Sequence, residues 1–290
     1  MPPPAADAPC PEQAFNATAL KWHTCAWLLL PVLVFLTGWM HWYAALPLTL
    51  LTAAGLAPRK RKEPQTRDSL PAFPLFTRSS FLALAAFAAL TALSGWGEWV
   101  NQHPDHIVRN ACLRELVASP WPVIFPDGNV LIYNTGFWLV PALAGKLAGL
   151  DAARVLVVLW GTWGLFLSWL WLCVFSGRRS LLLALLMAAF GSLLNLQCWL
   201  GLDLFRLHYF GTAEQIMCSA NASIPVLLFF IFLASGRMPL YWMPILFAAT
   251  AFYSPLAALG GLPLAACQWH RQWKGVLPLR DVLLHPSFSA

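Results

Sequence analysis

The sequence has few charged residues, and this scarcity excludes an ordinary soluble domain. Only 10% of its 290 residues are charged, 59% are hydrophobic, and the mean hydropathy is +0.63. A soluble domain carries about a quarter charged residues to solvate its surface. The apolar residues fall in long runs, such as Ser180–Leu200 and Leu240–Cys267, and a helix needs about 20 apolar residues to cross the hydrocarbon core. The composition therefore predicts an integral membrane protein.

The apolar runs also lack the alternation of apolar and polar residues that a transmembrane β-strand shows. Helices satisfy their own backbone hydrogen bonds in lipid, so a run that is apolar on every face is typical of a helix. We therefore predict an all-α fold, a polytopic transmembrane helical bundle.

Several motifs of soluble enzymes are missing. The chain has no GxSxG, no phosphate-cradling Gly-rich loop, no Ser/His/Asp signature and no HExxH. Its seven cysteines are scattered without CxxC spacing, which argues against a metal site and a disulfide framework, although a Cys112–Cys218 bridge stays open. The basic residues behind the net charge of +6 are distributed as expected for the cytoplasmic loops of a membrane protein, and this distribution argues against binding of nucleic acid. We predict no metal, no cofactor and no nucleic-acid partner.

Topology follows from the basic residues, because short cytoplasmic loops hold the excess of Lys and Arg. The strongest cluster is Arg59-Lys60-Arg61-Lys62. Placing it inside puts 13 of the 18 Lys and Arg residues on the cytoplasmic side: Lys21, Arg59, Lys60, Arg61, Lys62, Arg67, Arg78, Arg178, Arg179, Arg237, Arg271, Lys274 and Arg280. The predicted order is a disordered cytoplasmic tail (1–24), a transmembrane hairpin (25–57), a basic cytoplasmic loop (58–79), a transmembrane core (80–270) with periplasmic loops 96–149 and 201–219, and a cytoplasmic end (271–290).

One apolar stretch in the first outer loop could either cross the membrane or lie along its surface. Asn134–Leu147 is apolar enough to cross the membrane, but a crossing there would export Arg178 and Arg179. We therefore predict an amphipathic helix lying in the outer interface. The remaining spans are then Ser80–Ser94, Val155–Phe175, Ser180–Trp199, Ile224–Ala234, Trp242–Tyr253 and Leu256–Gln268, the last two separated by a break at Ser254-Pro255.

Polar and ionisable residues gather in two outer segments, Glu98–Asn110 and Asp203–Gln215. We expect these segments to approach each other over a cavity. Asp105 follows Pro104 where a helix would begin, so it fits either an N-cap or a general base for an acceptor hydroxyl. Arg109, one turn later, fits either a phosphate-binding role or a salt bridge to Asp105.

The order of these segments resembles bacterial membrane glycosyltransferases of the GT-C architecture, including the enzymes that use polyprenyl-phosphate sugars. Asp105, Asn110 and Ala111 match a string typical of a less characterised branch, whereas His106, Ile107 and Arg109 differ from it. Four stretches carry the resemblance: Gly38-Trp39 with Trp42, Asp105–Leu113, Pro120–Val123 and Leu131–Leu143.

The resemblance implies a transferase in the bacterial inner membrane that takes a sugar from a polyprenyl-phosphate donor to an acceptor on the periplasmic side. Asp105 would be the catalytic base. Members of the family continue with further spans, so the chain is expected to be a fragment or a truncated member. Substrate-binding residues implied by the resemblance are His103, His106, Arg109, Asn110, Arg206, His208 and Glu214.

Two other functions fit a membrane protein of this kind. A transporter or flippase of lipid-linked substrates should carry buried ionisable residues within its spans, or broken helices. A non-catalytic membrane scaffold should lack a cavity above the outer loops.

Overall fold

The computed structural model describes residues 17–57, 77–100, 102, 104–190 and 211–273. Within these ranges every regular element is a helix, and one isolated β-bridge pairs Ile124 with Val130. The predicted all-α fold is therefore confirmed for the described part of the chain. Its helices are α1 (Ala17–Trp39), α2 (Trp42–Leu56), α3 (Arg78–Leu93), α4 (Pro104–Ala118), α5 (Gly136–Ala148), α6 (Leu150–Ser176), α7 (Leu181–Ala189), α9 (Thr212–Ala234), η2 (Leu240–Trp242), α10 (Met243–Tyr253), α11 (Pro255–Gly260) and α12 (Leu262–Trp273).

Three of the described helices are long and apolar enough to cross a membrane: α1, α6 and α9. Helix α6 has 27 residues, or about 40 Å at 1.5 Å per residue, which exceeds the roughly 30 Å of the hydrocarbon core. Helices α2, α3, α5 and the stretch Leu240–Tyr253 are apolar but shorter.

The first hairpin turns where the sequence predicts, between α1 and α2, but α1 begins at Ala17. The prediction of a disordered tail up to residue 24 is therefore wrong from Ala17 onward. The start of α1 packs against the bundle: Leu20 is buried, and the Thr24 hydroxyl accepts a 2.8 Å hydrogen bond from the Trp171 indole.

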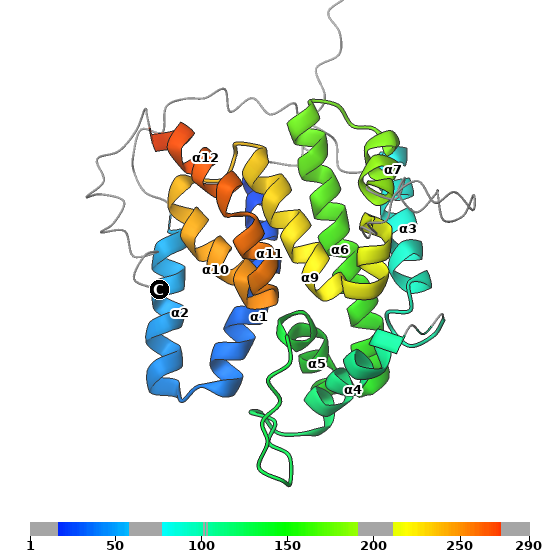
Figure 1. The fold of residues 1–290 in the computed structure, drawn as a ribbon, viewed down its shortest axis with the longest axis vertical. Coiled ribbons are helices and arrows are strands. Elements are labelled where there is room, and N and C mark those ends of the chain that lie inside the picture. The colour runs from blue at the N-terminus through cyan, green and yellow to red at the C-terminus, as the bar shows by residue number, and fades with distance from the viewer. Residues whose placement is uncertain (1–16, 58–76, 101, 103, 191–210, 274–290) are drawn as a thin grey trace, which may run out of the picture.

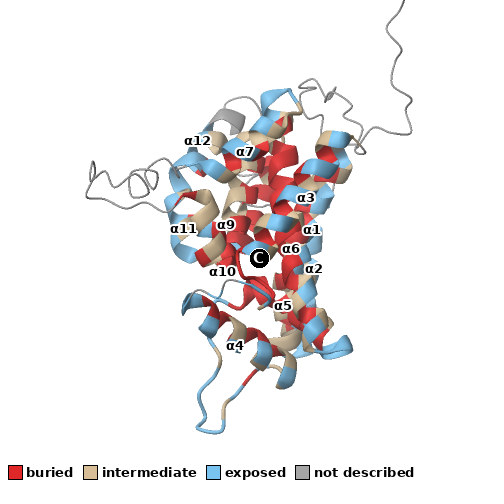
Figure 2. Cartoon of the chain, turned by 90° about the vertical axis from the view of Figure 1, so that its right-hand side faces the viewer, coloured by how far each residue is buried: buried red, intermediate tan, exposed pale blue. Residues whose placement is uncertain are grey.

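Helix α6 forms the centre of the bundle, where close packing depends on glycine. A Cβ added at Gly164 would lie 2.6 Å from Ile224 Cγ2 and 2.7 Å from the Trp27 ring. Trp27 is fully buried and stacks on Trp160. Figure 2 shows the buried residues concentrated along these inner helices, with exposed residues on the outer faces and in the loops. The missing side chain thus allows α6 to approach α1 and α9 closely.

The predicted break at Ser254-Pro255 is confirmed. Ser254 has an extended conformation (φ −154°, ψ 95°) and separates α10 from α11, because proline removes a helical N–H and disfavours helix in the residue before it. Of the predicted span Ser180–Trp199, α7 covers Leu181–Ala189, and residues 191–199 lie outside the described part.

Helix α5 does not lie across the end of the bundle, which corrects the prediction of an interfacial helix. Phe137 lies near Gly161, whereas a Cβ at Gly145 would lie 2.9 Å from the Ala153 Cβ. The reversed order of these contacts means that α5 runs antiparallel along the first half of α6. More than half of its 13 residues are buried, because the glycine contacts and Pro141 give it a packed face that composition alone does not reveal.

The two ends of the bundle differ in charge. The start of α3 and the turns after α6 and α9 lie at one end and carry Arg78, Arg178, Arg179 and Arg237. The α1–α2 turn, α4 and the start of α6 lie at the opposite end (Figure 1). Which end faces the periplasm stays a prediction, and we refer to the end that holds α4 as the outer end.

Candidate functional site

Helix α4 forms where the sequence predicts an amphipathic helix after Asp105. Pro104 opens it, at a position where its missing N–H costs no helical hydrogen bond. Its buried residues recur at helical spacing and face the bundle: His106, Arg109, Cys112, Leu113 and Leu116. The helix therefore presents one imidazole and one guanidinium to the interior of the outer end.

The turn before α4 places Trp96 and Glu98. Gly95 and Gly97 have positive φ angles, and Glu98 is the one described non-glycine residue with a positive φ (67°). Glu98 forms ion pairs with Arg114 (2.5 Å) and with Arg154 of α6. Burial raises the pKa of Glu98, but the hydrogen bonds and charges of the two arginines outweigh it and hold the pKa below its usual value. Glu98 is thus a fixed anion that ties this turn to α6.

Helix α9 is interrupted near its outer end. Ser219 has φ −151° and ψ 43°, so the helical conformation stops and restarts there. At its first turn, the Glu214 carboxylate accepts a 3.0 Å hydrogen bond from the Gly211 N–H. The structure therefore gives Glu214 a capping contact, where the resemblance implied substrate binding.

The turn before α4 and α4 itself contact α9 at this break. The Trp96 indole donates to the Ile216 carbonyl (2.8 Å), His106 Nε2 lies 2.9 Å from the Met217 carbonyl, and Arg109 Nη2 donates to Ser219 Oγ (3.3 Å). These contacts reach residues 216–219, which directly follow the second segment; residues 203–210 of that segment lie outside the described part, so the approach of the two segments and the cavity between them stay predictions. We refer to these six residues as the α4–α9 junction.

Arg109 is the charged centre of the junction. Its side chain is 8% exposed, its Nη2 lies 3.7 Å from Asp105 Oδ2, and its guanidinium carbon lies 5.7 Å from the Trp96 ring centroid. Its Nε and Nη1 atoms are buried and have no hydrogen-bond partner among the described residues. Buried polar atoms are nearly always paired, so these two donor atoms of a buried cation need an explanation.

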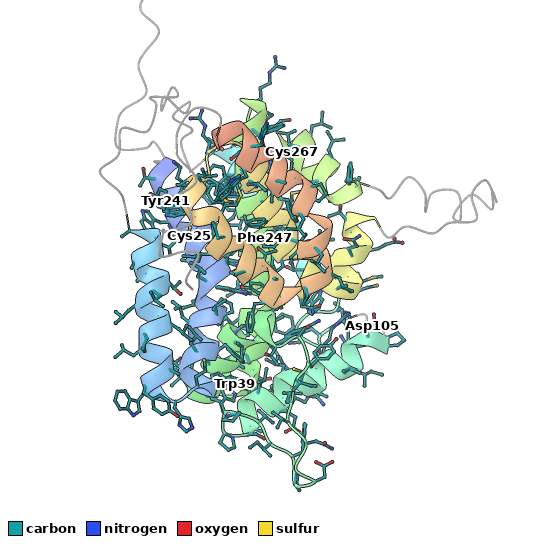
Figure 3. All side chains as sticks on the ribbon, turned by 60° about the vertical axis from the view of Figure 1, so that its left-hand side comes forward. Cys25, Trp39, Asp105, Tyr241, Phe247 and Cys267 are labelled. Atoms are coloured by element: carbon teal, nitrogen blue, oxygen red, sulfur yellow. The ribbon has the colours of Figure 1, made fainter. Side chains whose placement is uncertain are left out.

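Asp105 lies in the first turn of α4, and 51% of its side chain is exposed. Figure 3 shows it at the free end of α4, beside the first turns of α9. Its ion pair with Arg109 is the i, i+4 pair that the spacing predicted. Asp105 can therefore be reached from outside the bundle while staying next to the buried guanidinium.

The other predicted site residues divide into two groups. Asn110 donates a 2.8 Å hydrogen bond to Gln102, which in turn donates to the Gly95 carbonyl, so it braces the preceding turn. His103, Arg206 and His208 lie outside the described residues. In the described part, no three His, Cys, Asp or Glu side chains are grouped to hold a metal, and Cys112 and Cys218 are free thiols.

Sequence reasoning missed Trp96 and Ser219. A signal for Ser219 exists in the string Ser219-Ala220-Asn221-Ala222-Ser223, which puts small and polar residues inside an otherwise apolar helix. A signal for Trp96 is its position between Gly95 and Gly97, which allow a tight turn.

Comparisons with protein-family models, curated proteins and solved structures found no match to this chain.

Proposed function

We propose that the protein is a membrane transferase that binds a phosphate-linked lipid at its outer end, and that it transfers a sugar from a polyprenyl phosphate to an acceptor hydroxyl. The observation that carries the proposal is Arg109, a buried cation with two donor atoms that have no partner among the described residues, beside a half-exposed carboxylate. Guanidinium groups bind phosphate through pairs of N–H donors. The resemblance to GT-C enzymes supplies the sugar and the polyprenyl chain. The proposed location is the bacterial inner membrane, with the site on the periplasmic side.

In the proposed reaction, the acceptor oxygen attacks the anomeric carbon of the donor and the bond from that carbon to the phosphate oxygen breaks. The acceptor proton passes to the Asp105 carboxylate, and the polyprenyl phosphate leaves with the bonding electron pair. Arg109 stabilises the charge that develops on the leaving phosphate, and a low-dielectric setting strengthens this interaction. No metal or redox partner is required for the balance of this step.

Helix α9 also supports a second candidate, a transporter of lipid-linked substrates. Its break at Ser219 is the kind of discontinuity that transporters use around a substrate. Against this, the sequence has no Asp, Glu, Lys or Arg between residues 25 and 39, 155 and 176, or 216 and 234, where a transporter would place its buried charges. The transferase explains the exposed Asp105, which translocation does not need.

The substitution Asp105→Asn tests the transferase. Because asparagine keeps the shape and the capping ability of aspartate but accepts no proton, we expect sugar transfer in isolated membranes to fall by about 10²–10⁴-fold with unchanged protein abundance. Asp127→Asn, in the exposed turn between Phe125 and Asn129, is the matched control and should keep full activity. An active Asp105→Asn variant would show that Asp105 is not the general base. Lipid translocation without sugar transfer in reconstituted vesicles would favour the transporter.

A further inference from the structure

Helices α3 and α7 pack side by side at one edge of the bundle, and both begin at the end opposite α4 (Figure 1). A hydrogen bond joins their starting points, because Arg179 Nη1, in the turn before α7, donates to the Thr77 hydroxyl at 3.1 Å. The same hydroxyl accepts a hydrogen bond from the Ser80 N–H and so caps α3. The turn between α6 and α7 is therefore in direct contact with the start of α3.

Each of the two helices exposes a stripe of large apolar side chains. In α3 these are Phe81 and Leu82, and in α7 they are Leu182, Leu185 and Leu186, all between 55% and 65% exposed. Helical spacing places the members of each stripe on one face, while other residues of the same helices are buried in the bundle. Contiguous exposed apolar side chains of this kind mark contact with a partner or with lipid.

Arginine side chains lie where the two stripes reach the end of the bundle. Arg78 is exposed and precedes Phe81 and Leu82 by three and four residues, so it lies on the same face of α3. Arg178 is exposed in the turn before α7 and is adjacent in the chain to Arg179, which contacts the start of α3. The acidic residues of the described ranges lie elsewhere, between the end of α3 and the first turn of α6 or in the first turn of α9: Glu98, Asp105, Glu115, Asp127, Asp151 and Glu214. This surface therefore joins positive charge at the end of the bundle to an apolar strip along its side.

An anionic phospholipid has the same two-part chemistry. Guanidinium groups bind phosphate oxygens through N–H donors, and the acyl chains cover apolar side chains next to the headgroup. A zwitterionic lipid such as phosphatidylcholine has similar chains but no net charge, so it matches the apolar part of the surface better than the charged part. A soluble phosphate matches only the charged part.

We propose that the surface formed by Arg78, Arg178 and the two apolar stripes, the α3–α7 patch, binds anionic phospholipids in the membrane leaflet at this end of the bundle. Basic residues near a membrane surface attract anionic lipids, and each one changes the affinity by about fivefold. A headgroup bound there contacts α3 and the turn before α7 at once, which stabilises the packing of the two helices. The patch lies at the opposite end from the α4–α9 junction, so the proposal requires a membrane around the bundle but no sugar transfer.

The test measures lipid binding to the purified full chain in detergent, by energy transfer from tryptophan to pyrene-labelled phosphatidylglycerol. Pyrene-labelled phosphatidylcholine with the same acyl chains is the reference without net charge. Because Arg78 and Arg178 are both exposed, we expect the parent to prefer phosphatidylglycerol by about 25-fold. Arg78→Gln and Arg178→Gln should each lower this preference by about fivefold and leave the affinity for phosphatidylcholine unchanged. Arg178→Lys, which keeps the charge, should retain most of the preference.

Arg237→Gln is the matched control, because it removes the same charge at the same end of the bundle but in the turn after α9. It should keep the preference for phosphatidylglycerol. Equal binding of the two lipids by the parent would overturn the proposal, and so would an equal loss in Arg237→Gln and Arg78→Gln, which would assign the preference to net charge alone. Displacement of the lipid by an equal concentration of inorganic phosphate would show a site for soluble anions instead. Thermal unfolding of each variant verifies that it is folded.

Discussion

The Glu98 ion-pair cluster leads to the most quantitative prediction. Glu98 Oε2 contacts Arg114 and Arg154, its side chain is 9% exposed, and Arg154 also pairs with Asp151. The substitution Glu98→Gln keeps the size and one oxygen acceptor but removes the charge. Because the amide oxygen cannot match a carboxylate facing two guanidinium groups, we expect the free energy of unfolding to fall.

The magnitude follows from the exposure of each partner. Arg114 is 55% exposed, so its pair contributes about 0.2–1 kcal/mol. Arg154 is 22% exposed, and a hydrogen bond between charged groups in such a place contributes about 1.5–3 kcal/mol. We expect a total loss of about 2–4 kcal/mol. Asp151→Asn is the matched control, because Asp151 shares Arg154 but is 92% exposed, and its loss should stay below about 1 kcal/mol.

The assay is thermal unfolding of the purified protein in detergent, followed by tryptophan fluorescence between pH 7 and pH 3. The folded pKa of Glu98 lies below the unfolded value, so its stabilisation is complete above the unfolded pKa of about 4.3 and is lost as pH falls through the folded pKa. The E98Q variant should therefore lose less stability than the parent over this acid range. Equal destabilisation by E98Q and D151N, or parallel pH profiles of parent and E98Q, would refute this reasoning.

Three further predictions concern the junction, the core and the topology. Trp96→Phe should lower the free energy of unfolding by about 1–3 kcal/mol, because it removes the indole donor from the buried Ile216 carbonyl. Trp160→Phe is the control and should lose no hydrogen bond, since the Trp160 indole N–H has no partner among the described residues. Equal losses of the two variants in denaturant titration would contradict this. Gly164→Ala should cost about 1–3 kcal/mol through overpacking against groups 2.6–2.7 Å away, and an unchanged melting temperature would show that the helices separate freely. A single cysteine at Asn129 should react with a membrane-impermeant maleimide added to intact cells, and reaction only after permeabilisation would reverse the topology.

The local features of the fold could be predicted from the sequence, because each depends on transfer free energy or on neighbouring residues. Long apolar runs with few charges require helices in lipid, and the structure has three helices of suitable length among its described residues. The break at Ser254 follows from Pro255, and the Asp105–Arg109 ion pair follows from helical spacing. Arg78 and Arg237 lie at the same end of the bundle, as expected when basic residues stay on one side of a membrane.

The tertiary structure alone decided which polar residues are buried together. Arg109 and Ser219 are 110 residues apart in the sequence. No pattern within α4 shows that Arg109 Nε and Nη1 have no hydrogen-bond partner among the described residues, or that the neighbouring Asn110 donates to Gln102. The course of α5 along α6 was predicted wrongly, because it depends on the fit of Gly145 against Ala153 and not on composition. Close packing between distant segments is a property of both surfaces at once, and a single stretch of sequence records only one of them.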